Sequence, residues 1–164
     1  MENGVELFMI LGIDPGLANT GFAIVSEDEK LIKVGCIVTS VKSVERLGEI
    51  YDSLDKLIKK FKVKEVAIES LYFAKNEKSA SRVAEAIGMI KTLAYLHEIK
   101  VFEYSPLKIK MCLTGYGRAD KSQVELMVKN MLNRKKKITP SHASDAVAVA
   151  LTHLSHRRLN CFVS

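Results

Sequence analysis

The chain has 164 residues, 48% of them hydrophobic, and a formal net charge of +6 at neutral pH. This length predicts a single globular domain over residues 1–164, and no apolar segment is long enough to span a bilayer. The N-terminus lacks the pattern of a signal peptide and the three cysteines stand singly, without metal-ligand spacing, so we expect a cytoplasmic protein with reduced thiols.

The N-terminal part of the chain predicts a three-stranded meander followed by a helix. Three apolar runs predict strands at residues 9–14, 22–25 and 30–39. The first run stops at Asp14, and a Pro-Gly pair then marks a tight connection to the second. Apolar residues recur at helical spacing over residues 44–61, with Ser43 as the expected N-cap, and we expect this helix to pack on the sheet.

The rest of the chain predicts alternating strands and helices. Two short apolar runs predict strands at residues 65–69 and 100–105. Helical spacing predicts helices at residues 79–97, 105–113, 120–132 and 141–157. Ala146, Ala148 and Ala150 are small enough to let the last helix approach a sheet closely. The order βββαβαβααα indicates an α/β fold with a mixed five-stranded sheet flanked by helices.

Acidic side chains stand at positions that the predicted fold would bring together. Asp14 and Glu69 each end an apolar strand, while Asp145 lies three residues after His142 on the same face of the last helix. Converging carboxylates repel one another unless a cation is present, and oxygen ligands with one imidazole favour Mg²⁺ or Mn²⁺ over structural zinc. Each residue also has an ordinary alternative, such as an aspartate that merely fixes its own turn or an acid in the first turn of a helix.

A metal site of this kind suits hydrolysis of a phosphodiester, in which one ion activates water and a second stabilises the leaving oxygen. The charge distribution points to the same class of substrate. Residues 1–99 carry 13 basic and 15 acidic side chains, whereas residues 100–164 carry 12 basic and 4 acidic ones. A basic half indicates a polyanionic partner, most simply nucleic acid, although solvated lysine faces are the alternative.

An ordered set of motifs spreads over almost the whole chain. Its segments are Gly12-Ile-Asp-Pro-Gly16 with Thr20-Gly21, Ala67-Ile-Glu69, Ala74-Lys-Asn76, Ser79-Ala80, Tyr104-Ser-Pro106, Lys110, Thr114–Val124 and Asp145–His153. Together they resemble the RuvC-type Holliday junction resolvases. The resemblance implies a ribonuclease-H-like fold and a homodimer that nicks two strands of a four-way DNA junction symmetrically, in homologous recombination and DNA repair. It also implies cooperation with the RuvA and RuvB branch-migration proteins.

The resemblance also assigns the metal ligands. Asp14, Glu69 and Asp145 match the family's metal-binding carboxylates, which implies two Mg²⁺ ions per active site, with Mn²⁺ as a substitute. His142 stands where many members carry a fourth acid and some carry histidine. We therefore expect His142 to act in metal binding and catalysis, with activity retained and a stronger preference for Mn²⁺.

The same comparison places the DNA contacts. They are expected at Tyr72, Phe73, Lys75, Lys110, Arg118 and Lys121. Tyr72 matches an aromatic residue that stacks on or unstacks bases at the crossover, although this ring can instead pack in the dimer or the core. The loop at residues 114–121 offers backbone amides that suit phosphate binding, while the basic residues 134–137 are assigned only to general electrostatic attraction.

Three other functions fit parts of the sequence. Asp14, Gly16 and Gly21 also satisfy the phosphate loop of actin-like ATPases and sugar kinases, but those proteins need a second, similar domain that this length excludes. The second alternative is a module that binds junctions without cleaving them, which applies if His142 prevents metal binding. A related ribonuclease-H-like nuclease acting on RNA is the third, and the motif at 114–124 weighs against it. The helix at 79–97 is either the dimer face or a central buried helix.

Overall fold

The computed structural model describes residues 7–40, 45–71 and 77–161, with the backbone alone at 77–79 and 160–161. Its strands are β1 (Met9–Asp14), β2 (Asn19–Ser26), β3 (Leu31–Val38), β4 (Glu65–Glu69) and β5 (Lys100–Tyr104). Its helices are α1 (Arg46–Phe61), α2 (Glu77–Leu96), α3 (Pro106–Thr114), α4 (Lys121–Met131) and α5 (Ser141–Cys161). This order of elements confirms the predicted one.

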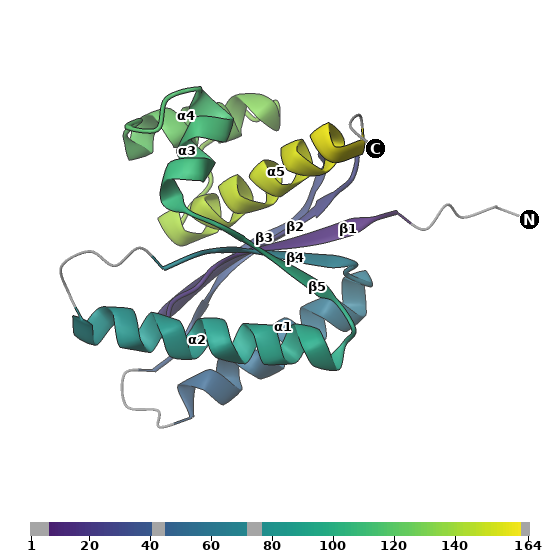
Figure 1. Cartoon of the computed structure of the whole chain (residues 1–164), viewed down its shortest axis with the longest axis vertical. Helices are drawn as coiled ribbons and strands as arrows, with labels where there is room; N and C mark the ends of the chain where they lie inside the picture. Colours follow the sequence, from purple (N-terminus) through teal and green to yellow (C-terminus); the bar gives the residue numbers. More distant parts are fainter. Residues whose placement is uncertain (1–6, 41–44, 72–76, 162–164) are drawn as a thin grey trace, which may run out of the picture.

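The five strands form one mixed sheet in the order β3-β2-β1-β4-β5. β1 pairs antiparallel with β2, and β2 with β3, while the β1–β4 and β4–β5 pairs are parallel. The expectation of a mixed five-stranded sheet is therefore confirmed. β1 lies at the centre, and its parallel neighbour β4 ends at the same edge of the sheet, so the residues that close these two strands are neighbours in space (Figure 1).

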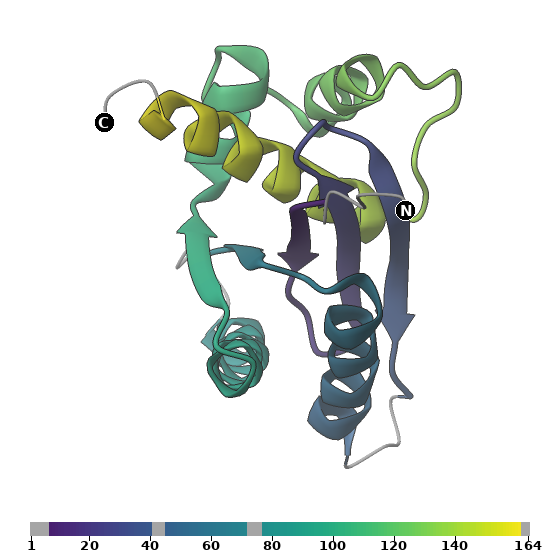
Figure 2. The same ribbon diagram turned by 90° about the vertical axis from the view of Figure 1, so that its right-hand side faces the viewer.

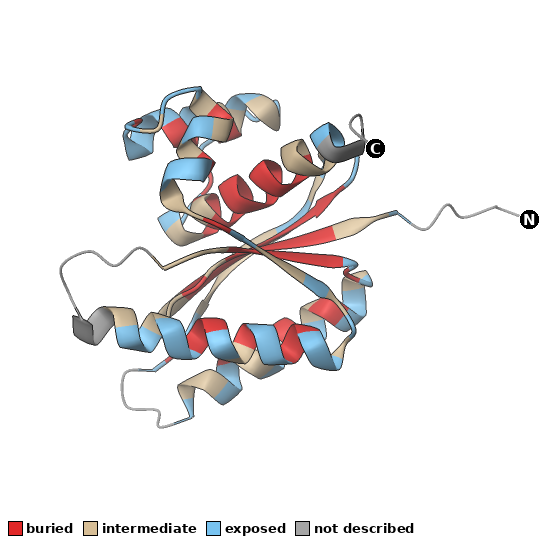
Figure 3. Cartoon of the chain, in the orientation of Figure 1, coloured by how far each residue is buried: buried red, intermediate tan, exposed pale blue. Residues whose placement is uncertain are grey.

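Helices cover both faces of the sheet. α1 and α2 lie on one face and α3, α4 and α5 on the other, as the two perpendicular views show (Figures 1 and 2). Because both faces are covered, β1 and β4 are continuous apolar runs rather than alternating ones. The buried residues lie in the central strands, in the middle of α5 and on the inner sides of α1 and α2 (Figure 3). None of the helices in the described ranges is long and apolar enough to cross a membrane.

The helix boundaries differ from the predicted ones by up to four residues, most at the end of α5. α1 begins at Arg46 with Glu45 as its N-cap, and no side chain caps it, so the prediction of Ser43 as the cap is wrong. α5 runs to Cys161, about one turn beyond its predicted end. Near this end, Arg157 pairs with Glu65 of β4, and Arg158 pairs with Glu29 between β2 and β3.

Candidate active site

The close approach of α5 to the sheet depends on glycines in β1 and β2. A Cβ atom added to Gly12 would lie 2.3 Å from the Ala146 carbonyl oxygen and 2.7 Å from the Ala150 Cβ. One added to Gly21 would lie 1.9 Å from the carbonyl oxygen of His142. Glycine is therefore required at both positions, and the small side chains predicted in the last helix serve the same contact. The first turn of α5 is thereby placed beside the end of β1.

This packing brings Asp14, His142 and Asp145 together. Each offers one ligand atom within 4.8 Å of the other two, and His142 Nδ1 lies 2.7 Å from Asp14 Oδ2. The turn after β1 is held by other groups, because the Thr20 hydroxyl donates to the Gly16 carbonyl and the Thr39 hydroxyl to that of Leu17. Asp14 therefore has a long-range role besides any part in its own turn.

Glu69 joins these residues from β4. Its neighbour Ile68 pairs with Ile13, so Glu69 and Asp14 end adjacent parallel strands on the same face of the sheet. Burial, followed by the nearby charges of Asp14 and Asp145, raises the pKa of Glu69 to about 7. Burial also raises the pKa of Asp14, against the lowering effect of His142. The negative charge of the carboxylates is thus not fully balanced by nearby protein groups, and a bound cation would stabilise their ionised forms.

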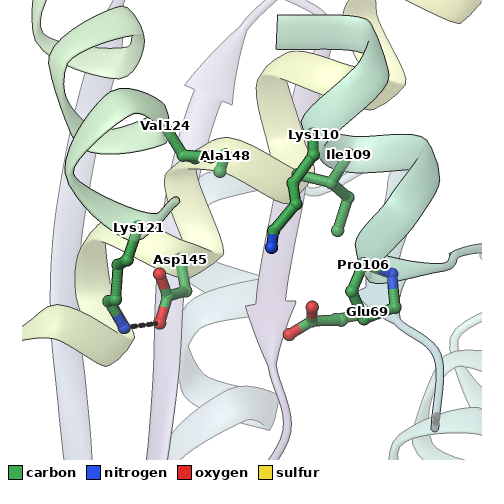
Figure 4. Close-up of a pocket in the computed structure, with 8 residues that line it drawn as sticks. All are labelled: Glu69, Pro106, Ile109, Lys110, Lys121, Val124, Asp145 and Ala148. Carbon is green, nitrogen blue, oxygen red and sulfur yellow. Dashed lines mark hydrogen bonds and ion pairs between the residues drawn. The ribbon is translucent and has the colours of Figure 1, made fainter. Parts of the chain in front are cut away.

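Two lysines approach the same carboxylates. Lys121, the first residue of α4, places its Nζ 2.7 Å from Asp145 Oδ2. Its burial lowers the pKa, but the hydrogen bond and the surrounding carboxylates raise it overall. Lys110 on α3 points into the cleft between Asp145 and Glu69 (Figure 4). The cleft, with a volume of about 230 Å³, therefore has acids on its floor and ammonium groups at its side.

The walls of this cleft include apolar residues that the sequence did not assign to the site. They are Pro106, Ile109, Val124 and Ala148 (Figure 4). Pro106 and Ile109 come from α3, the helix of Lys110, and Val124 lies one turn after Lys121 on α4. The only signal in the sequence is this helical spacing from the predicted lysines. These walls partly exclude water and so strengthen the electrostatic interactions inside the cleft.

The loop between α3 and α4 differs from its expected role. The backbone amides of Gly115, Tyr116, Ala119 and Asp120 all donate to acceptors within the protein. They are therefore not available to a phosphate, and the expectation of an amide cradle is wrong for these four groups. The Arg118 side chain is exposed. We expect the loop to contact phosphates mainly through its side chains.

The remaining predicted contacts have different positions. Tyr72, Phe73 and Lys75 lie outside the described residues. The basic residues 134–137 are exposed between α4 and α5, and Lys137 lies 2.5 Å from Glu125. The structure therefore places Glu69, Asp145, Lys110 and Lys121 around one cleft, groups Asp14 and His142 with Asp145 beside it, and leaves the basic residues 134–137 as a separate surface.

The donor set of the cleft fits a divalent cation. Asp14, Asp145 and His142 offer ligand atoms within 4.8 Å of one another, and the Glu69 carboxyl interacts with Asp14 from the neighbouring strand. Carboxylate oxygens with one imidazole suit hard divalent ions with some tolerance for a nitrogen ligand. The raised pKa values of Asp14 and Glu69 agree with this, since a bound cation would offset the burial and the neighbouring negative charges that raise them.

Comparisons with known proteins agree on one family. The family model for crossover junction endodeoxyribonuclease RuvC matches residues 10–153. Proteins of that name from Finegoldia magna and Aliarcobacter butzleri are 43% and 45% identical to this chain, over 88% of it and over 92% and 96% of their own lengths. The structure of T. thermophilus RuvC in complex with a Holliday junction substrate is similar, with a TM-score of 0.89 and 31% identity over 93% of this chain and 96% of that one.

Proposed function

The chain belongs to the RuvC family of crossover junction endodeoxyribonucleases, and on this basis we propose that it resolves four-way DNA junctions by paired, symmetric nicks. The observation that carries the proposal is the convergence of three carboxylates and His142 beside two lysines at one end of the sheet. We place this activity in a single ribonuclease-H-like domain of a cytoplasmic protein that acts in recombination and repair. The family and the acidic cluster together fit the use of a divalent metal.

We assign Asp14, Glu69, His142 and Asp145 as the metal ligands and Mg²⁺ as the ion, with Mn²⁺ as a substitute. Two bound ions would supply an activated water and stabilise the leaving oxygen of the phosphodiester. Asp14 and Glu69 stand on rigid strand ends, and His142 and Asp145 stand near the start of helix α5. Ligands on such elements hold their positions better than ligands on loops.

The basic side chains around the cleft bind the scissile strand in this proposal. Lys110 and Lys121 approach the carboxylates from α3 and α4, where their ammonium groups can neutralise phosphate oxygens. When the phosphate is bound, Lys121 exchanges part of its interaction with Asp145 for one with the phosphate. Arg118, exposed on the preceding loop, adds a further phosphate contact.

Aromatic and basic residues before α2 complete the DNA contacts by their positions in the sequence. Tyr72 stacks on bases at the crossover, with Phe73 and Lys75 beside it. A stacked ring contributes about 1–3 kcal/mol per base, so Tyr72→Ala should weaken junction binding by about 5- to 150-fold. Junction binding and cleavage at the parental level by Tyr72→Ala would remove this role.

Paired nicks require two active sites, and we propose a homodimer formed through the outer side of α2. On that side, no atom of another described segment lies within 4 Å of a Cβ added to Gly88. Tyr95 and Leu96 are 80% and 62% exposed there. Exposed apolar groups of this size on a helix favour a protein partner. Family membership further implies cooperation with RuvA and RuvB.

The proposed function is tested by cleavage of a labelled synthetic four-way junction in Mg²⁺ and in Mn²⁺. We expect paired nicks at symmetric positions that leave ligatable duplexes, and their loss in Asp14→Asn, which preserves the shape of the side chain. The same assay with an RNA–DNA hybrid tests the alternative nuclease. Tight junction binding without nicks in either metal would contradict the proposal and indicate a non-cleaving module.

A further inference from the structure

A buried network of polar side chains lies away from the cleft, on the same face of the sheet. The hydroxyl of Tyr104 lies 2.7 Å from His153 Nδ1, and His153 Nε2 lies 2.7 Å from Glu65 Oε2. Arg157 donates to the other oxygen, Glu65 Oε1, at 2.8 Å. His153 is 2% exposed and Tyr104 5%. The network joins β4, β5 and α5, two of which carry proposed metal ligands.

The donors and acceptors of the network determine which atoms carry the protons. The Glu65 carboxylate can only accept, so His153 Nε2 carries a proton. Burial lowers the pKa of His153, so its ring is neutral and its Nδ1 accepts from the Tyr104 hydroxyl. Every polar atom of His153 is therefore paired, and Arg157 balances the charge of Glu65. A fully paired buried network favours one arrangement of the elements that it joins.

The network and the metal cleft share the same pair of elements. Along β4, Glu65 lies four residues before Glu69, or about 13 Å. Along α5, His153 lies eight residues after Asp145, or about 12 Å. The two distances are thus nearly equal, with the Glu65–His153 pair at one end and the converging acids at the other.

Tyr104 also contacts the end of β4 directly. It pairs with Glu69 in the sheet, and its carbonyl oxygen accepts from the amide of Ser70. The side chain of Tyr104 therefore ties α5 to the backbone on which Glu69 stands. With no ion bound, the acids of the cleft repel one another and favour separation of α5 from β4. A tilt of α5 by about 5° would move Asp145 by about 1 Å over this length, which is more than the roughly 0.2 Å that a metal site tolerates.

We propose that Tyr104, His153, Glu65 and Arg157 are positioning residues that set the separation of Asp145 and Glu69 and thereby the metal affinity of the cleft. None of the four lines the cleft. They act through the angle between α5 and β4, not through contact with substrate or ion. This inference rests on the proposed metal site.

The test compares Mn²⁺ binding by the DNA-free protein, measured from the EPR signal of free Mn²⁺, with thermal stability. Tyr104→Phe removes one hydroxyl and leaves the ring packed. His153→Leu removes the centre of the network. The matched control is His97→Leu, which removes another histidine–carboxylate pair at 2.7 Å, between His97 and Asp55 on the opposite face of the sheet. Temperatures are kept well below the Tm of each variant.

We expect Tyr104→Phe to raise the Kd for Mn²⁺ by about 2- to 30-fold, the usual range of coupling between sites. The His97→Leu variant should bind Mn²⁺ like the parent, although it is also destabilised. Junction cleavage by Tyr104→Phe should require more Mn²⁺ but approach the parental rate at saturation. If the network only stabilised the fold, Tyr104→Phe would not raise the Mn²⁺ concentration needed for cleavage while leaving the maximal rate unchanged.

Three results would overturn the inference. The first is an Mn²⁺ affinity of Tyr104→Phe equal to that of the parent. If His153→Leu does not fold, the result for Tyr104→Phe is sufficient by itself. An equal loss of affinity in His97→Leu would show that lowered stability, not position, weakens binding. If the parent itself does not bind Mn²⁺, the proposed metal site is refuted and the inference with it. If the parent binds Mn²⁺ and Tyr104→Phe binds it equally well, only the inference is refuted.

Discussion

His142 and Asp14 are separated by 128 residues in sequence, yet His142 Nδ1 lies 2.7 Å from Asp14 Oδ2. Because the carboxylate accepts, Nδ1 carries the proton, and the other ring nitrogen keeps a lone pair that can bind a metal. The contact orients Asp14, and it places an imidazole rather than a fourth carboxylate beside Asp14 and Asp145. The identity of residue 142 should therefore influence which metal supports cleavage.

Replacing His142 tests this directly. We expect His142→Ala to reduce junction cleavage by at least about tenfold in both metals, because a ligand and the orientation of Asp14 are removed together. His142→Asp should restore cleavage in Mg²⁺ and lower the ratio of Mn²⁺-supported to Mg²⁺-supported rates, since oxygen replaces nitrogen. Rates at saturating protein in each metal provide the measurement. Cleavage by His142→Ala at the parental rate would exclude His142 as a ligand.

The raised pKa of Glu69 predicts how the stability of the metal-free protein depends on pH. Its pKa is about 7 in the folded protein against an ordinary value of 4.5, so between these values the folded state binds more protons than the unfolded state. This contribution to stability is complete below pH 4.5 and is lost as the pH rises through about 7. Because protons compete with the metal, the Mg²⁺ requirement should also fall as the pH rises through the same range.

Urea unfolding in EDTA measures this effect, with Glu69→Gln as the control. The parent should be more stable relative to Glu69→Gln at pH 5 than at pH 7.5. Other groups that titrate in this range, such as His153, are present in both proteins and cancel in the difference. In saturating Mg²⁺, without EDTA, the stability of the parent relative to Glu69→Gln should no longer fall as the pH rises. A difference between the two proteins that does not change with pH would contradict the raised pKa.

Gly12 should be intolerant of even one methyl group. Gly12→Ala places a Cβ against the Ala146 carbonyl and the Ala150 side chain, both on buried helix α5, so the helix must shift. We expect a loss of about 1–3 kcal/mol in the free energy of unfolding and weaker metal binding. Gly48→Ala is the matched control, because nothing lies within 4 Å of its added Cβ in α1. It should stabilise the protein by about 0.4–1 kcal/mol, and urea unfolding compares the two.

The exposed basic residues between α4 and α5 should affect binding more than chemistry. Replacing Arg134, Lys135 and Lys136 with glutamine should weaken junction binding and reduce the slope of log K against log salt by about 0.9 for each phosphate that is no longer neutralised. Lys137 is left in place because it pairs with Glu125. At saturating protein, the cleavage rate should stay at the parental level.

Lys110→Gln is the contrasting variant. Lys110 points into the cleft, so its replacement should reduce the cleavage rate even when all junctions are bound (Figure 4). Salt titrations of binding and single-turnover cleavage separate the two effects. A large loss of single-turnover cleavage in the triple variant would contradict this division between the basic surface and the cleft.

Local sequence patterns are sufficient to predict the order of elements and the type of sheet. Apolar runs ending at Asp14 and Glu69 mark buried strands, and helical spacing marks α1 to α5, because both patterns follow from local backbone geometry. Helix boundaries are predicted less well, and α5 runs to Cys161. The pairing of Arg157 with Glu65 near that end depends on the fold.

How the predicted residues meet depends on contacts between distant segments. The sequence indicated that Asp14, Glu69 and Asp145 converge, but the contact of His142 with Asp14 depends on α5 lying close to Gly12 and Gly21. Likewise, no local pattern distinguishes Glu65 from an ordinary acid at the start of a strand, although it pairs with His153 at 2.7 Å in the core. Local patterns determine which face a side chain occupies, whereas its partners are set by long-range packing, which is not encoded in any single segment.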